Sequence, residues 1–294
     1  MRKRVIEVTH NQVKVACCVI LYLPSRSALD HINSLPTLFD RIIVVDNTDL
    51  SRIEYDIPKT SKSVIYIRLG SNLGIAYALN VAANKAIFDG YDWLLTLDQD
   101  SQINSAFIKS MTSYFRCIDL RKLGLIAPVQ ISKPNDIRNY KSSFSEILTT
   151  MTSGSFLNLV AYQNCGAFEE LLFIDHVDHE YCLRLHAKGF KVIQCNHIVL
   201  THSLGEVKEI SLLGYSTSIT THKPFRLYYF TRNGFYVAQK YIFRYPQFAI
   251  FFMAQMFKRL VKIMFYEEDK LNRLRFICAG VKDFLHKRYG RYIQ

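Results

Sequence analysis

The sequence predicts an α/β fold, with a mostly parallel sheet flanked by helices and a helical extension at the C-terminal end. Apolar, β-branched runs alternate with helical patterns over the first 130 residues, which is typical of βαβ units. Hydrophobic residues make up 49% of the 294, so a large core is available. From residue 223 the pattern becomes helical and basic. We therefore expect an α/β domain at residues 1–222 and a basic helical region at 223–294.

The first half of the chain contains four predicted strands. A strand covered on both faces is apolar throughout, without the alternation of a half-exposed strand. The runs that fit are residues 15–22, 41–46, 64–68 and 93–97. A helix is expected over residues 74–88, because Ala76, Leu79 and Ala83 fall on one helical face.

In the second half of the chain, the hydrophobic pattern predicts fewer strands and helices. Residues 131–145 are polar and predict a mobile loop. A short helix is expected from about residue 179 to 188, because Gly189 follows in a capping position. An apolar strand is expected at residues 192–200. Pro246 is well placed as the first residue of a long helix.

The net charge of +12 is concentrated in the C-terminal region. Residues 223–294 hold 15 basic and 4 acidic side chains, a net of +11, whereas the first 222 residues have a net charge of only +1. A basic segment can bind nucleic acid, anionic lipid or an acidic ligand. A solvated surface of long helices is the alternative. Because the region has no recognisable DNA- or RNA-binding motif, we expect no nucleic-acid partner.

Several protein classes are disfavoured by the sequence. The seven cysteines include no C-x-x-C pair, so we expect reduced, buried thiols in a cytosolic protein. The apolar run at 15–23 is short and lacks a secretory cleavage pattern. Residues 248–257 are about half of the roughly 20 that a membrane span needs. Glycine-rich dinucleotide, P-loop and nucleophile-elbow motifs are absent from the sequence.

Two carboxylates directly follow the fourth predicted strand, in the segment Asp98-Gln99-Asp100. Ligands of open α/β sheets bind at the carboxyl ends of strands. Carboxylates spaced i, i+2 suit Mg²⁺ or Mn²⁺, whose remaining ligands can be diphosphate oxygens. An Asx turn that caps a helix near Ser105 is the structural alternative. Asp46 closes the second strand in the same way, and a turn-forming role is equally open there.

A second acidic cluster enters the helix expected near residue 179. It contains Asp175, Asp178 and Glu180. The helix dipole favours acids at this position, and Glu180 has the i, i+4 spacing of an ordinary ion pair with Arg184. This leaves Asp178, and secondarily Asp175, without a structural purpose. A general base is a natural one.

His202 follows the strand expected at residues 192–200. An isolated histidine is more often structural than a ligand. Its place at another strand end makes it a candidate for contact with a metal or a phosphate.

The order of seven segments resembles the family 2 glycosyltransferases, which have a GT-A fold. These segments are VILYLP, VVDN, SNLGIAYALN, LTLDQDS, TSGS, FIDHVDHEYCLR and THSLG. DQDS, FIDHVDHEYCLRL and RLYYFTRN at residues 226–233 resemble the bacterial rhamnosyltransferase branch in particular. The resemblance covers nearly the whole chain. It departs at Leu23, where the family usually has Asn between Tyr and Pro.

The resemblance implies a nucleotide-sugar site. The nucleoside would lie against Tyr22 and Asp46, with Asn72 and Gly74 lining the same side. Asp98 would contact the ribose or the diphosphate and contribute to the metal site.

The resemblance also implies the reacting groups. Asp178 matches the catalytic base, Asp100 would hold the metal, and His202 would help to hold the metal–diphosphate. The segment near the acceptor is represented by Ser153 and Gly154, and we group Asp175 with this side.

The implied activity is an inverting, metal-dependent transfer, most simply of L-rhamnose from dTDP-L-rhamnose. The acceptor would be a saccharide in bacterial cell-surface polysaccharide synthesis, such as the O-antigen of lipopolysaccharide. Transfer of galactofuranose or another hexose from a UDP-sugar is the second choice. A non-catalytic nucleic-acid- or membrane-binding protein is the alternative from another class, but it would leave Asp98, Asp100 and Asp178 without a purpose.

The resemblance also suggests a cellular location. Acceptors in the family are often lipid-linked saccharides at the inner face of the cytoplasmic membrane. The basic C-terminal region suits an anionic membrane surface. We therefore expect a cytoplasmic protein that is peripheral on that membrane. The apolar residues 248–256 could equally form a helix buried against the catalytic domain.

Overall fold

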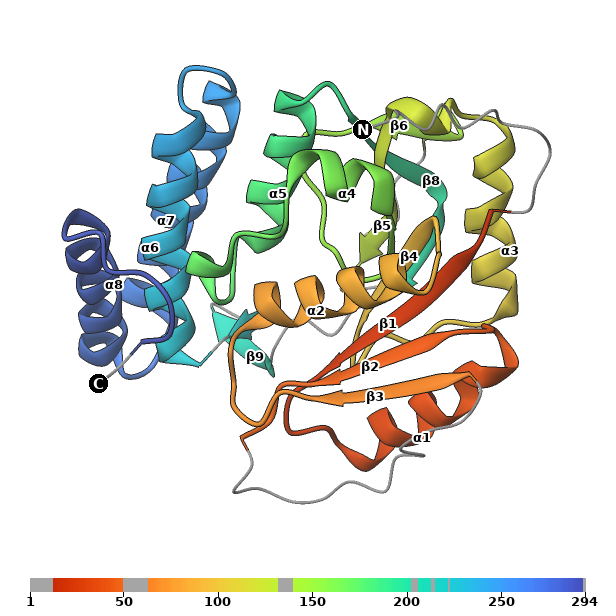
Figure 1. Ribbon diagram of the computed structural model, residues 1–294. Helices are drawn as coiled ribbons and strands as arrows, with labels where there is room; N and C mark the ends of the chain where they lie inside the picture. The colour runs from red at the N-terminus through yellow and green to blue at the C-terminus, as the bar shows by residue number, and fades with distance from the viewer. Residues whose placement is uncertain are drawn as a thin grey trace.

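The computed structural model describes residues 13–49, 63–131, 140–201, 206–212, 215–221 and 223–292. Its centre is an eight-stranded sheet with strand order β3-β2-β1-β4-β7-β5-β8-β6 (Figure 1). The strands are β1 (Val15–Leu21), β2 (Ile42–Asp46), β3 (Val64–Arg68), β4 (Trp93–Asp98), β5 (Leu123–Ile131), β6 (Phe144–Glu146), β7 (Ser155–Asn158) and β8 (Lys191–Thr201).

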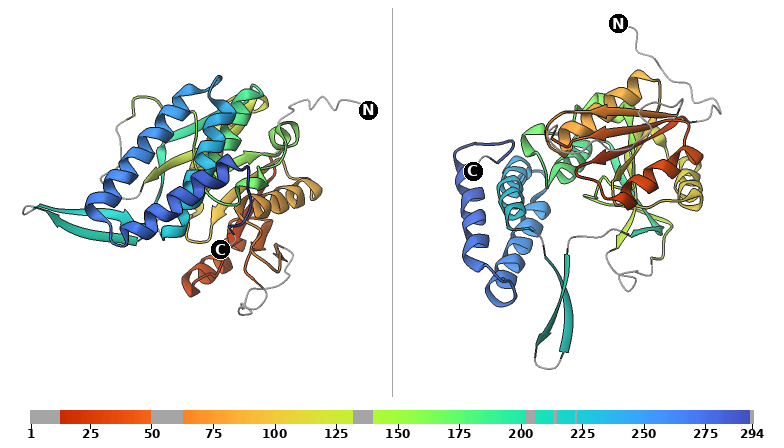
Figure 2. Two further views of the ribbon diagram at one scale, coloured as in Figure 1. Left: turned by 90° about the vertical axis from the view of Figure 1, so that its left-hand side faces the viewer. Right: turned by 90° about the horizontal axis from the view of Figure 1, so that it is seen from below.

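The sheet is mostly parallel, as predicted. β1 pairs in parallel with both β2 and β4, β2 pairs in parallel with β3, and β5 pairs in parallel with β8. β7 runs antiparallel between β4 and β5, and β6 runs antiparallel along β8. A separate hairpin of β9 (Glu206–Leu212) and β10 (Tyr215–Thr221) projects from the body (Figure 2).

Helices cover both faces of the sheet. The neighbours Cys17 and Cys18 of β1 are fully buried in opposite layers, which explains the continuous apolar run of this strand. One layer contains α1 (Arg26–Ser34) and α3 (Ser105–Ser113). The other contains α2 (Ile75–Phe88), α4 (Leu159–Cys165) and α5 (Val177–Ala187). Short 3-10 turns occupy Leu35–Thr37, Tyr114–Arg116, Leu120–Lys122 and Glu170–Leu172.

Three helices form the C-terminal region, at one side of the sheet (Figure 1). They are α6 (Pro224–Tyr241), α7 (Pro246–Tyr266), which begins at the predicted proline, and α8 (Lys270–Leu285). Val237, Phe248 and Phe252 belong to the same buried cluster as α2 and α5. A Cβ atom at Gly234 would lie 2.0 Å from the Phe252 ring, so this glycine permits the close contact of α6 with α7. Within the described residues, no helix is both long and apolar enough to span a bilayer.

Some elements differ from the sequence-based expectation. β6 lies at the end of the predicted loop 131–145, of which residues 132–139 are outside the described part. Its three residues form a strand because they pair with β8, and such pairing is a tertiary effect that local pattern does not reveal. α5 begins at Val177, two residues earlier than expected.

All seven cysteines are free thiols. Five are buried as predicted, and burial raises the pKa of Cys18 to about 12. Cys117 and Cys278 are exposed, so the expectation of burial is wrong for these two.

Candidate active site

The carboxyl ends of β1, β2 and β4 meet at one edge of the sheet. The chain leaves β1 for β2 and β3 on one side and returns to β4 on the other. A topological switch point therefore lies between β1 and β4, the place where open α/β sheets bind ligands. Asp46 and Asp98 are aligned with Leu21 and Ile20 at the end of β1. Tyr22 follows immediately.

The carboxylate of Asp46 is completely buried and has partners within the protein. It accepts hydrogen bonds from the Tyr66 hydroxyl and, at 2.9 Å, from the backbone N–H of Thr48. The Arg68 Nε lies 4.0 Å from it. Asp46 therefore fixes the turn after β2, and its contact with a nucleoside stays a prediction.

Asn72 and Gly74 shape the turn that leads into α2. The side-chain oxygen of Asn72 accepts hydrogen bonds from Asn47 Nδ2 at 3.0 Å and from the Gly74 N–H at 3.1 Å. Gly74 has φ of 92°, and a Cβ atom there would lie 2.6 Å from the Phe173 carbonyl oxygen. The Ile75 N–H donates to the same carbonyl at 2.7 Å. The start of α2 is thus held against the loop that precedes α5.

The segment that follows β4 lies directly beside the end of β1. Asp98 is half-buried and Asp100 is exposed. Between them, Gln99 Oε1 accepts a hydrogen bond from the Tyr22 N–H at 2.9 Å. Both carboxylates therefore stand at the carboxyl end of β4, beside the switch point, and their contact with a metal stays a prediction.

Ser153 and Gly154 support the carboxyl end of β4. The Ser153 hydroxyl accepts from the Asp98 N–H at 3.0 Å and contacts the Ser101 hydroxyl at 2.6 Å. Gly154 has φ of 75°, and a Cβ atom there would lie 2.4 Å from Leu200 Cδ2. Because Ser153 is buried, its structural role is to hold the backbone of Asp98 through this hydrogen bond. A contact with an acceptor stays a prediction.

The donor atoms after β4 fit a divalent cation. Asp98 and Asp100 offer hard carboxylate oxygens, and Mg²⁺ or Mn²⁺ commonly binds one or two protein carboxylates together with phosphate oxygens. Within the described part of the chain, no three His, Cys, Asp or Glu side chains are grouped to hold a metal. His202, the third predicted anchor, lies outside the described residues.

The loop before α5 has an unusual backbone. Phe173, Asp175 and His176 have φ of 64°, 62° and 62°, a region that costs non-glycine residues about 1–3 kcal/mol each and is concentrated at functional sites. The Asn233 side chain of α6 holds this loop by donating to the carbonyls at positions 172, 174 and 175, at 2.7, 2.7 and 3.1 Å.

Arg226, in the first turn of α6, links the two carboxylate clusters. Its Nη2 lies 2.5 Å from Asp175 Oδ1. The negative charge of Asp175 raises the pKa of the Arg226 guanidinium against the opposite effect of burial, and Asp98 and Asp178 raise it further. One cation is therefore within electrostatic reach of the end of β4 and the start of α5.

Sequence reasoning missed the importance of Arg226. The available signal was its place in the first turn of a helix, because the helix dipole disfavours a cation there unless an anion compensates.

Asp178 is the second residue of α5 and is half-buried. Its Oδ1 accepts a hydrogen bond from the His179 N–H at 2.9 Å. A carboxylate in the first turn of a helix is stabilised in its charged form by the helix dipole. The charge of Asp178 also acts on Arg226.

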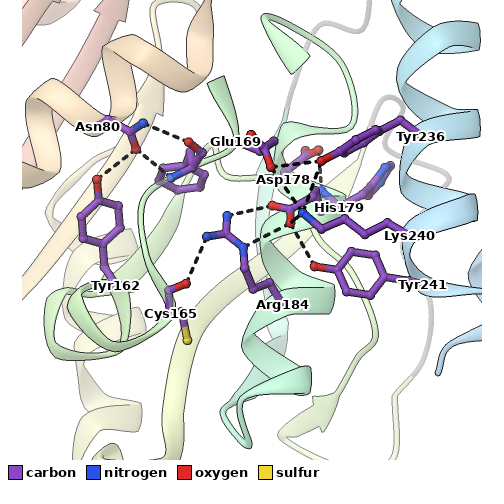
Figure 3. Close-up of polar contacts among 12 residues, drawn as sticks. Asn80, Tyr162, Cys165, Glu169, Asp178, His179, Arg184, Tyr236, Lys240 and Tyr241 are labelled. Carbon is purple, nitrogen blue, oxygen red and sulfur yellow. Dashed lines mark hydrogen bonds and ion pairs between the residues drawn. The ribbon is translucent and has the colours of Figure 1, made fainter. Parts of the chain in front are cut away.

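Glu180 is the centre of a buried polar network in the first turn of α5, and its partners Arg184, Lys240 and Tyr241 are labelled in Figure 3. It forms the predicted i, i+4 pair with Arg184, at 3.1 and 2.8 Å, and also accepts from Lys240 Nζ and the Tyr241 hydroxyl, each at 2.9 Å. Burial alone would raise the pKa of Glu180, but Arg184 and Lys240 outweigh this effect and lower it. The network fixes α5 against α6.

Comparison with known proteins agrees with this arrangement. Residues 26–149 match the Glycosyl transferase family 2 profile. The dTDP-rhamnosyl transferase RfbF of Shigella flexneri is 29% identical over 248 residues, which cover 76% of this chain and 79% of that protein.

Solved structures at 12–14% sequence identity share the fold. GalNAc-T7 with UDP, GalNAc and Mn²⁺ has a TM-score of 0.59 over 95% of this chain, which spans 57% of that protein's length. TarS 1–349 of S. aureus with UDP-GlcNAc has 0.58 over 94% and 81% of the two chains. A Pyrobaculum calidifontis mannosyltransferase with GDP-Man and Mn²⁺ has 0.56 over 94% and 88%. The fold is GT-A, and the family 2 match together with the dTDP-rhamnosyl transferase relative supports a glycosyltransferase of the rhamnosyltransferase branch of family 2.

Proposed function

We propose that this protein transfers L-rhamnose from dTDP-L-rhamnose to a saccharide acceptor in the synthesis of a bacterial cell-surface polysaccharide such as an O-antigen. The S. flexneri relative, named a dTDP-rhamnosyl transferase, supports the choice of donor. The ion pair of Arg226 with Asp175, and the charges of Asp98 and Asp178 that raise the pKa of Arg226 further, support a single reaction site.

The reaction is a single displacement with inversion at the anomeric carbon. Asp178 takes the proton of an acceptor hydroxyl, whose oxygen attacks the anomeric carbon from the side opposite the diphosphate. The bond to the leaving oxygen breaks, and its electron pair goes to the nucleoside diphosphate. A positioned general base typically contributes about 10²–10⁴-fold to the rate.

Two positive charges would stabilise the negative charge on the leaving diphosphate. A divalent ion, when bound, neutralises the charge that grows there. Asp98 and Asp100 would hold this ion, together with His202 by family resemblance. Arg226 adds positive potential, and its pair with Asp175 keeps the guanidinium in place.

The nucleoside occupies the side of Tyr22, Asn72 and Gly74. Tyr22 exposes 42% of its surface at the switch point, so its ring can pack against a base. Asp46, which is buried, acts by shaping the turn. Ser153 and Gly154 serve the acceptor side by bracing β4.

We place the enzyme at the inner face of the cytoplasmic membrane as a peripheral protein with a lipid-linked saccharide acceptor. The net charge of +11 over residues 223–294 supports this location. In this view residues 1–222 form the catalytic domain and 223–294 the membrane-facing region.

Donor turnover tests the proposal. Release of nucleoside diphosphate is measured with Mn²⁺ or Mg²⁺, with dTDP-L-rhamnose, UDP-galactofuranose and UDP-GlcNAc compared at equal concentration. We expect turnover of dTDP-L-rhamnose, and an anomeric proton spectrum of the product that shows inversion. Preference for a UDP-sugar would replace the donor, and retention of configuration would exclude the displacement by an Asp178-activated hydroxyl.

A further inference from the structure

Helix α7 is apolar on two opposite faces. Phe248, Phe252, Met256 and Ile263 are buried against the rest of the protein. On the other side, side chains spaced three, four and seven residues apart form one continuous stripe, because this spacing repeats a helical face. This outward stripe consists of Ile250, Met253, Phe257, Val261, Met264 and Phe265, which are 37% to 75% exposed.

Exposure on this scale requires a partner. Single exposed apolar residues are ordinary, but a contiguous patch marks an interaction with a protein or a membrane. Phe243, in the turn before α7, is also fully exposed. In the left view of Figure 2, α7 and α8 face the viewer on the side away from the sheet.

The charges around the stripe favour an anionic surface. Lys258 follows Phe257 and is exposed. Among the few acidic residues of the region, Glu267 is largely neutralised by Lys262 at 2.8 Å and Arg273 at 2.9 Å. A second copy of the chain would bring two regions of net charge +11 face to face, which is repulsive. An anionic lipid surface is attractive for both the cations and the apolar side chains.

We propose that the outward stripe of α7 rests in the headgroup layer of an anionic bilayer, with the helix lying along the surface. At about 1.5 Å per residue, its 21 residues give a length of about 30 Å for this contact. Exposed phenylalanines and a flanking lysine are the side chains that interfacial helices use.

This placement orients the active site toward the lipid. The buried face of α7 packs directly on the loop before α5, with the Phe248 and Phe252 rings 6.1 and 5.6 Å from the His176 ring. His176 stands two residues before Asp178. A bilayer that holds the stripe therefore lies one helix away from the base. The inference rests on the proposed function only for the acceptor, because lipid docking itself needs no transfer activity.

A tryptophan reporter tests the orientation. The chain has one tryptophan, Trp93, which is buried in the sheet. Phe257→Trp adds a second in the stripe, and Phe88→Trp is the matched control, because Phe88 is 85% exposed at the end of α2. With vesicles of brominated phosphatidylglycerol and phosphatidylcholine, we expect quenching of Phe257→Trp only. Equal quenching of the two variants, or none, would overturn the orientation.

Vesicle flotation tests the affinity. Phe257→Ser and Phe265→Ser should each weaken binding to phosphatidylglycerol vesicles by about tenfold or more, because each removes a phenylalanine from the apolar layer. Phe88→Ser should bind like the unaltered protein, and vesicles of phosphatidylcholine alone should bind more weakly.

Two further measurements distinguish membrane contact from the alternative explanations of the stripe. Transfer to a soluble acceptor without vesicles should be unchanged in Phe257→Ser, which keeps the docking surface apart from the proposed activity. Light scattering should give the mass of one chain without lipid. A dimer that Phe257→Ser dissociates, together with unchanged vesicle binding, would assign the stripe to self-association and refute the membrane contact.

Discussion

The donor edge of the sheet and the loop that carries the base are built by different means. At the donor edge, the turns after β1 and β4 are held by backbone N–H groups and the neutral side chains of Gln99 and Ser153, and the turn after β2 is held by the buried Asp46. At the loop, three non-glycine residues have positive φ, and the neighbouring α5 is held by a buried carboxylate with two cations.

This difference shows which contacts stabilise each region and which residues are left for the proposed chemistry. The donor edge is held by short contacts at the ends of strands, and Asp98 and Asp100 are its proposed metal ligands. The loop keeps a strained backbone because α6 holds it through Asn233 and Arg226. Asn233 and Arg226 of α6 are therefore part of the proposed reaction site, and changes at these two residues should affect catalysis.

The largest effect is expected for Asp178→Asn. If this carboxylate is the base, kcat should fall by about 10²–10⁴-fold, while donor affinity measured by calorimetry stays the same. Asp30→Asn, on the exposed face of α1, is the control and should be neutral. Near-normal turnover of Asp178→Asn with bound donor would remove the base from this position.

Arg226→Gln tests whether the two regions act together. Loss of a charged group aimed at the leaving diphosphate should reduce kcat by up to about 10²–10³-fold. The Arg226–Asp175 pair is partly exposed, so unfolding free energy should change by only about 0–1 kcal/mol. An unchanged kcat would show that Arg226 only supports the loop.

Glu180→Ala tests the stability of the base-carrying helix. Removing a buried acid leaves Arg184 and Lys240 without their shared partner, which costs about 3–5 kcal/mol in the free energy of unfolding. Asp30→Ala breaks another i, i+4 pair, Arg26–Asp30, but that pair is exposed and should cost only about 0.3–0.5 kcal/mol. Denaturant titration of both variants measures the contrast, and equal losses would contradict the buried network.

The smallest effect is expected in the dependence of the free energy of unfolding on acidic pH. The pKa of Glu180 is lowered in the folded protein from its ordinary 4.5, so its charged form stabilises the fold above that value. This stability should be lost as the pH falls below 4.5 toward the lower pKa of the folded state. Glu180→Gln should lose less stability over this interval than the unaltered protein. An identical acid dependence would show that the network is not charged as described.

The sequence revealed those features that depend on nearby residues. The apolar runs of β1 to β4 are continuous in the chain, as are the acids that end β2 and β4, and the Glu180–Arg184 pair follows from helical spacing. The partners Lys240, Tyr241 and Asn233 are 58 to 61 residues from the groups they bind, and no periodic pattern predicts such contacts. β6 was missed for the same reason, because it forms only by pairing with β8.

The outward stripe shows another limit of the sequence. The apolar character of residues 248–256 was evident, but it allowed either burial or membrane contact. In the structure α7 has one buried apolar face and one exposed apolar face. Which of the two faces each side chain occupies depends on how α7 packs against α6 and α5.

Donor binding at Asp100 tests the central claim most directly. The free energy of unfolding is measured with dTDP-L-rhamnose and Mn²⁺, for the unaltered protein and for Asp100→Asn. A donor at about 100 times its dissociation constant should stabilise the unaltered protein by about 2.7 kcal/mol. This gain should disappear with a chelator and in Asp100→Asn. Equal stabilisation of both proteins, independent of the chelator, would contradict a metal–diphosphate site at the end of β4.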